Sequence, residues 1–142
     1  MYTSTHLALG LIIGKATGDY SAALWGSLII DVDHLIPAIE KKIFNFKKLW
    51  KRFHSSKDSS RSYFHSIFSW AIVSLVICLI DFNFGIVFSL AYLGHLLLDA
   101  IDNSDFFPFY PFKKYNIKGF IPYYSKKELA FSLYLLFIFV II

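Results

Sequence analysis

The sequence predicts an all-α protein, a small integral membrane bundle of about four to five helices whose metal-ligand residues cluster at one membrane face. The composition supports this fold class, because 56% of the 142 residues are hydrophobic and 20% are aromatic. Only 17% are charged, against about a quarter in soluble domains. The apolar residues are gathered into runs, and histidines and acids stand at the ends of those runs. A chain of this length predicts one domain, covering residues 1–142.

The first two apolar runs, residues 7–14 and 20–30, predict a helical hairpin. A short polar stretch from Lys15 to Asp19 separates them, and Gly18 within it marks a chain reversal. No charged residue precedes the first run, whereas a secretory signal begins with a basic region. We therefore expect the hairpin to stay part of the membrane domain.

Two longer runs without charge follow, at residues 62–80 and 84–98, and Asp81 and Asn83 lie between them. Each run is close to the about 20 residues that a membrane span requires. The final run, residues 129–142, is shorter, so we expect a tilted or half-embedded helix there.

The basic residues predict how these helices are oriented. Of the 14 Lys and Arg residues, eight lie between residues 41 and 61 and five between residues 113 and 127. The positive-inside rule places both stretches in the cytoplasm, and we expect the first to be a partly helical segment on the membrane surface. Neither stretch spreads over a polar face with interleaved aromatic residues, which argues against nucleic acid as a partner.

Histidines and carboxylates converge on the same face as the basic stretches. The hairpin returns the N-terminal histidine to that face, and the other histidines and acids open or close the later runs there. Imidazole and carboxylate ligands suit zinc, manganese and iron, and His95 and Asp99 share a helix face because they are four residues apart. We predict one or two divalent cations, zinc first, with manganese or iron as alternatives. The candidate metal ligands are His6, Asp31, Asp33, His34, His65, His95 and Asp99.

Each part of this cluster also has a purely structural interpretation. His6 alone could be an ordinary polar residue near the N-terminus. The acids after residue 30 could simply end a helix. Acids at a helix C-terminus oppose the helix dipole, however, so a positive charge nearby is expected. His95 and Asp99 could form an interhelical hydrogen bond, but ionisable groups in a membrane are costly to bury and are therefore functional by default. The single cysteine, Cys78, excludes a cysteine-based zinc site.

Four blocks follow one another along nearly the whole chain: Thr5-His6, GSLIIDVDH at residues 26–34, RSYFHS at residues 61–66, and GHLLLD at residues 94–99 followed by Pro111-Phe112. Together they resemble the YdjM-like family of membrane-bound metal-dependent hydrolases. Ile30 stands where the family has proline, which removes no ligand. Ser60 stands where the family has a histidine, so one ligand for a second ion is missing unless another side chain substitutes.

Two acids also depart from the family pattern, at Asp102 and Asp105. They either recruit a second cation or solvate the loop, and solvation is the favoured interpretation. Ser66, beside a candidate ligand, is expected to cap a helix, since no dedicated base accompanies it to make it a nucleophile.

The resemblance implies a metal-dependent hydrolase. The positive-inside orientation predicts a multi-pass protein of the cell membrane with its site at the cytoplasmic headgroup level, so we expect a phosphoester or a lipid-linked substrate. The resemblance also implies a distant similarity to zinc-dependent phospholipase C, whose cation activates water. Seven ligand groups exceed what one tetrahedral zinc needs, so either two ions bind or one carboxylate is catalytic. We assign Asp33 as bridging ligand or general base, and Arg61 as a clamp for phosphate or a positive-inside anchor.

Membrane lipids are the expected partners, with an anionic phospholipid or a lipid-linked molecule as substrate; the sequence leaves the oligomeric state open. Two other functions remain open. A non-catalytic adaptor would keep the metal for structure alone. A cation or proton transporter would spread polar residues through the membrane depth, whereas here they cluster at one end.

Overall fold

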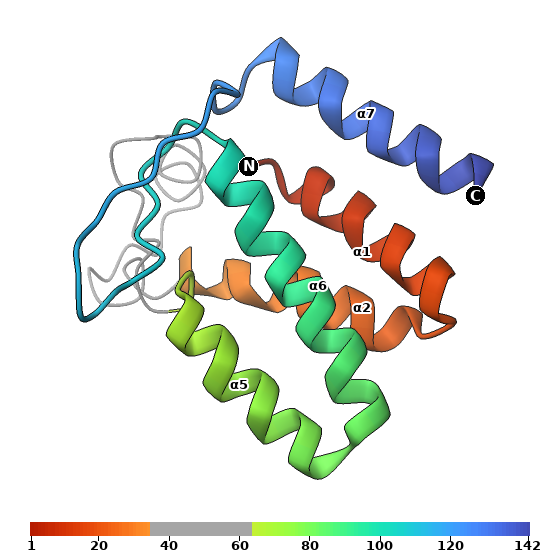
Figure 1. Cartoon of the computed structure of the whole chain (residues 1–142). Helices are drawn as coiled ribbons and strands as arrows, with labels where there is room; N and C mark the ends of the chain where they lie inside the picture. The colour runs from red at the N-terminus through yellow and green to blue at the C-terminus, as the bar shows by residue number, and fades with distance from the viewer. Residues whose placement is uncertain (35–63) are drawn as a thin grey trace, which may run out of the picture.

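The computed structural model describes residues 1–34 and 64–142, with side chains described for residues 1–31 and 64–142. Within these residues the fold is all-helical, which confirms the predicted class (Figure 1). The basic stretch at residues 41–61 lies outside the described residues. The elements are α1 (Thr3–Thr17), α2 (Tyr20–Leu28), the 3-10 helix η1 (Ile29–His34), α5 (Ile67–Ile80), α6 (Phe82–Ile101) and α7 (Lys126–Ile141).

The predicted hairpin is formed by α1 and α2, which pack against each other. Gly18 ends α1 in the left-handed conformation, with φ at 80°, and its N–H donates to the carbonyl of Gly14 at 2.9 Å. Glycine adopts this conformation without the steric cost of a Cβ. Asp19 then caps α2 by accepting from the backbone N–H of Ala22 at 2.9 Å. The local signals for reversal and restart are therefore the ones read from the sequence.

The two charge-free runs form α5 and α6, but only α6 is long enough to cross a membrane. Its 20 residues rise about 30 Å, which equals the hydrocarbon thickness of a bilayer. The 14 residues of α5 rise only about 21 Å. The helix is shorter than the apolar run at residues 62–80, because Ser66 starts it late by accepting from the N–H of Ser69 at 3.2 Å. Asp81 separates α5 from α6 and caps α6 through the N–H of Phe84 at 3.1 Å.

The last apolar run forms α7, which packs along α1 (Figure 1). The helix begins before the apolar run does, because Ser125 caps it by accepting from the N–H of Glu128 at 3.2 Å. Its 16 residues rise about 24 Å, which is shorter than a full span, as predicted.

At the centre of the fold, α6 packs against α1, α2 and α5. Close approach of α2 to α6 depends on Gly26, because a Cβ there would collide with the backbone carbonyl of Phe88 and with Ala91. Small residues allow helices to pack at short distances. The buried core on this side consists of Ala22, Ile30, Phe88, Tyr92, Leu96 and Phe106.

Large apolar side chains also cover the outer surface of the helices. On α5, Ile72, Leu79 and Ile80 are 64%, 78% and 81% exposed, and the outer face of α7 is similarly apolar. Exposed apolar surface of this extent marks an interaction with a membrane or a partner. Between α6 and α7 the chain is irregular, with isolated bridges from Asp102 to Ile121 and from Phe106 to Ile117.

Candidate metal centre

Four separated segments bring three histidines and two aspartates together. His6 comes from the first turn of α1, and Asp31 from η1. His65 lies just before α5, and His95 and Asp99 lie on successive turns of α6. The three imidazoles and Asp99 are at most 1% exposed, whereas Asp31 is 21% exposed. A buried cluster of this kind needs partners or a cation to offset its desolvation.

The tightest part of the cluster is a triangle of atoms. His65 Nε2 lies 3.3 Å from His95 Nε2, and each of these nitrogens lies 3.4 Å from Asp99 Oδ2. Ligand atoms at about 2.0–2.1 Å from a tetrahedral zinc lie about 3.3–3.4 Å from one another. The three distances therefore match one face of a zinc coordination tetrahedron.

The tautomer of His95 is set by a hydrogen bond outside the triangle. Its Nδ1 lies 2.7 Å from the backbone carbonyl oxygen of Ser27. A carbonyl only accepts, so Nδ1 carries the proton and donates. In the neutral ring, Nε2 then presents a lone pair to the triangle. A metal-binding histidine is usually oriented in this way through its second nitrogen.

A second group of possible ligands consists of His6, Asp31 and His95, whose ligand atoms lie within 4.8 Å of one another. Asp31 Oδ1 is 3.7 Å from His95 Nε2, which makes it the candidate fourth ligand beside the triangle. Burial alone raises the pKa of Asp31, but the neighbouring imidazoles of His95 and His6 outweigh it, and the pKa lies below its ordinary value. The ionised carboxylate is the form that binds a cation.

His6 stacks on His95, with ring centroids 3.6 Å apart, and its Nε2 lies 3.4 Å from Asp99 Oδ1. Its Nδ1 is buried without a hydrogen-bond partner among the described residues. A buried imidazole nitrogen without a hydrogen-bond partner can offer its lone pair to a cation. His95 belongs to both groups of possible ligands but has only one nitrogen left for coordination. The described residues therefore fit one metal ion better than two.

The other carboxylate oxygen of Asp99, Oδ1, lies beside a positive charge. The α-ammonium of Met1 lies 3.0 Å from Asp99 Oδ1 and 2.7 Å from Asp102 Oδ2. Asp102 is fully buried, so the expectation that it solvates the loop was wrong. Asp105 does match that expectation, since it is exposed and pairs with Lys118 at 3.0 Å. Sequence spacing could not distinguish the two acids, because only the fold brings the chain terminus to Asp102.

A comparison with known protein families finds one that covers the chain. The family model described as YdjM inner membrane protein matches residues 1–142, the whole chain. The chain belongs to the YdjM inner membrane protein family. Among curated proteins and solved structures, nothing matches it.

The side chains of three predicted site residues lie outside the described part of the structure. Asp33 and His34 lie in η1, where only the backbone of these two residues is described, and Arg61 lies outside the described residues, as does Ser60. Their assignment as ligands, base or phosphate clamp stays a prediction. The capping role predicted for Ser66 is confirmed by its contact with Ser69.

One buried acid, Glu128, was not predicted from the sequence. Its carboxylate accepts from the backbone N–H of Tyr2 and, at 2.6 Å, from that of Tyr124. Burial raises the pKa of Glu128 despite these donors. The residue joins the start of α7 to the segment that precedes α1, and thereby supports the position of His6. Its place in the first turn of a helix after a serine cap was the only signal available.

Proposed function

We propose that the protein is a membrane-bound metal-dependent hydrolase that acts on a phosphoester or a lipid-linked substrate at the cytoplasmic headgroup level. The observation that carries the proposal is the triangle of His65 Nε2, His95 Nε2 and Asp99 Oδ2, whose edges are 3.3–3.4 Å. Two separate segments, the one before α5 and α6, must fold together to produce this spacing. Membership of an inner membrane protein family supports the location.

The proposed role of each candidate ligand follows from its position in the site. His65, His95 and Asp99 would hold a divalent cation, with zinc first and manganese or iron as alternatives. Such a cation polarises a phosphoryl oxygen and lowers the pKa of water to about 7. Asp31, the most exposed of the described ligand candidates, lies where a substrate would arrive. Its carboxylate would then serve either as a fourth ligand or as the acceptor of a proton.

The proposed substrate follows from charge and location. Lys113 and Lys114 are exposed on the irregular segment after α6, and the positive-inside rule assigns such residues to the cytoplasm. Basic residues near a membrane surface attract anionic lipid headgroups. An anionic phospholipid or a lipid-linked phosphoester therefore suits the site. We include Asp33 as base and Arg61 as phosphate clamp in the proposal.

One observation favours a second candidate function, a membrane adaptor with a structural metal. The three imidazoles and Asp99 are almost completely buried, as the ligands of a closed structural site are. A catalytic site keeps one coordination position open to substrate. In the described residues only Asp31 provides such access.

Metal content tests the site directly. Wild-type protein in nanodiscs is expected to hold about one equivalent of zinc by elemental analysis, as a tetrahedral site would. Asp99→Asn and His65→Gln are expected to weaken zinc binding at least about tenfold to a hundredfold. The matched control is Asp105→Asn, which changes an exposed aspartate in the following loop and should keep the metal. A wild-type protein that takes up neither zinc nor manganese would overturn the proposal.

Removal of the metal separates the hydrolase from the adaptor. A chelator should take the ion from a catalytic site while the helices stay folded, and re-addition of zinc should restore release of headgroup from phosphatidylglycerol nanodiscs. Loss of the ion together with loss of the fold would indicate a structural metal, since the ion then supplies folding energy. Circular dichroism on the same samples reports the fold.

A further inference from the structure

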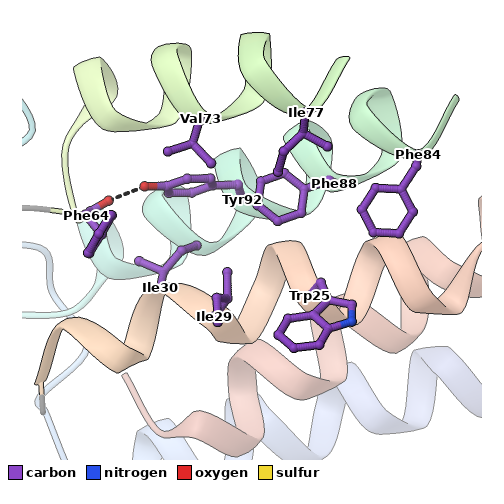
Figure 2. Close-up of a pocket in the computed structure, with 9 residues that line it drawn as sticks. All are labelled: Trp25, Ile29, Ile30, Phe64, Val73, Ile77, Phe84, Phe88 and Tyr92. Atoms are coloured by element: carbon purple, nitrogen blue, oxygen red, sulfur yellow. Dashed lines mark hydrogen bonds between the residues drawn. The ribbon is translucent and has the colours of Figure 1, made fainter. Parts of the chain in front are cut away.

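A cavity of about 490 Å³ lies between α2, α5 and α6 (Figure 2). This volume is in the range of small-molecule sites, which is about 300–1,000 Å³. The side chains that line it are almost entirely apolar, and they include Trp25, Ile30, Phe64, Ile77, Phe84 and Tyr92.

The cavity has little to offer a polar ligand. The Tyr92 hydroxyl donates to the backbone carbonyl of Phe64 at 2.5 Å, so its proton is already used (Figure 2). A polar metabolite buried here would lose its hydrogen bonds to water without replacement. A hydrocarbon would lose none. The chemistry of the walls therefore selects an aliphatic chain.

Two residues that line the cavity are the sequence neighbours of candidate metal ligands. Ile30 directly precedes Asp31, and Phe64 directly precedes His65. In Figure 2, Ile30, Phe64 and Tyr92 gather at one end, whereas Trp25 and Phe84 lie at the other. The lining therefore runs from the sequence neighbours of the ligands to residues of α2 and α6 that lie away from them.

The cavity also communicates with the apolar surface of the molecule. Trp25 and Phe64, which line it, are 57% and 41% exposed. The adjacent outer face of α5 carries Ile72 and Leu79, which are 64% and 78% exposed. In an inner membrane protein such a surface is surrounded by lipid chains, so a chain can enter from the bilayer without crossing water.

We propose that this cavity holds one hydrocarbon chain of the lipid substrate, with the phosphoester of the same molecule at the cluster of His65, His95 and Asp99. The inference rests on the proposed function and narrows its substrate class to a phosphoester that carries a long aliphatic chain. The chain would orient the scissile group, because its entry beside Asp31 and His65 leaves the polar end facing the ligands.

The test uses alkyl phosphates as probes, in zinc-loaded protein in phosphatidylcholine nanodiscs. A dodecyl phosphate with a terminal diazirine is photolysed, and the labelled residues are identified by mass spectrometry. Unlabelled methyl, hexyl and dodecyl phosphate then compete. Labelling is expected at α2, α5 and α6 residues of the cavity, and competition should strengthen with chain length, since each buried methylene adds to binding.

Two neighbouring residues of α5 provide a matched pair of variants. Val73 lines the cavity, whereas Ile72 is directed outward. Val73→Phe should weaken dodecyl phosphate about tenfold, the loss expected when about two methylenes no longer fit. Ile72→Phe should leave binding unchanged. Ile77→Ala, which enlarges the cavity, should shift the preference to longer chains, and it keeps the test decisive if Val73→Phe does not fold.

Labelling confined to the outer face of α5, or competition that is independent of chain length, would overturn the inference and indicate bulk lipid only. Equal binding by Val73→Phe and Ile72→Phe would overturn it as well. Zinc content is measured on each variant, so failure of the metal site is seen separately. Chain-dependent labelling that persists in Asp99→Asn, where metal is lost, would support the chain site even if hydrolysis failed.

Discussion

Within the site, each polar side chain is held by a partner that lies far away in the sequence. His95 is oriented by the carbonyl of Ser27, 68 residues earlier, and Asp99 contacts the α-ammonium of Met1, 98 residues earlier. The residue types could be predicted, because imidazole and carboxylate groups at the ends of apolar runs have few other uses. Their pairing could not, since it depends on which helices pack together.

Glu128 offers a prediction about stability. Glu128→Ala leaves the N–H groups of Tyr2 and Tyr124 without their acceptor, and an unsatisfied buried donor costs about 1–3 kcal/mol. We expect a lower thermal unfolding midpoint in detergent and a weaker hold on α7. Lys127→Ala, one residue away and exposed, is the control and should change little. An unchanged midpoint in Glu128→Ala would show that the contact contributes nothing.

The same residue predicts a dependence on pH. The folded-state pKa of Glu128 is raised above its ordinary value of 4.5, chiefly by burial, so the folded protein binds this proton more tightly than the unfolded chain does. Stability from this group is therefore fully present below pH 4.5 and is lost as the pH rises through the folded-state pKa. Unfolding midpoints measured from acid to neutral pH should decline more in wild type than in Glu128→Gln. Parallel curves would contradict the assignment.

Among the elements, the contact between α2 and α6 has the greatest influence on the site. It positions Asp31, just beyond α2, against His95 on α6. Helix existence followed from hydropathy and from local signals such as Gly18 and the Ser66 cap, because these act locally. Helix length could not be predicted in the same way. The apolar run at residues 62–80 is longer than α5, because the Ser66 cap starts the helix late.

Gly26 allows a prediction at this scale. Gly26→Val places a side chain against the backbone of Phe88, so α2 and α6 must separate. Overpacking of this kind costs about 1–3 kcal/mol. We expect a lower unfolding midpoint together with weaker zinc binding, because Asp31 moves away from His95. Ser21→Val, on the exposed side of α2, is the control for the valine itself. Zinc affinity that is equal in both variants would argue against Asp31 as a ligand.

For the molecule as a whole, the main question is how it sits in the membrane. Only α6, among the described helices, has the length and composition of a span, so the multi-pass arrangement and the cytoplasmic site remain proposals. The shorter helices α1 and α5 pack against α6, and α7 packs against α1. All three leave apolar side chains on the outside.

The single cysteine makes this arrangement testable. In a Cys78→Ser background, Ala16→Cys reports the last turn of α1, and Lys114→Cys reports the basic segment after α6; both positions are exposed. A membrane-impermeant maleimide added to intact spheroplasts should label Ala16→Cys but reach Lys114→Cys only after permeabilisation. The reverse pattern would invert the orientation, and equal labelling of both would mean that the hairpin does not cross.

The helical class, the hairpin, the types of ligand and the family could all be read from the chain, because hydropathy, capping and short motifs depend on neighbouring residues. The folded structure alone decided that His65, His95 and Asp99 form one triangle, that Asp102 is buried, and that Glu128 joins the two ends of the chain. It also decided where the apolar cavity lies. These features arise from contacts between residues about 30 to 130 positions apart, and such contacts are set by how the helices pack rather than by any local pattern.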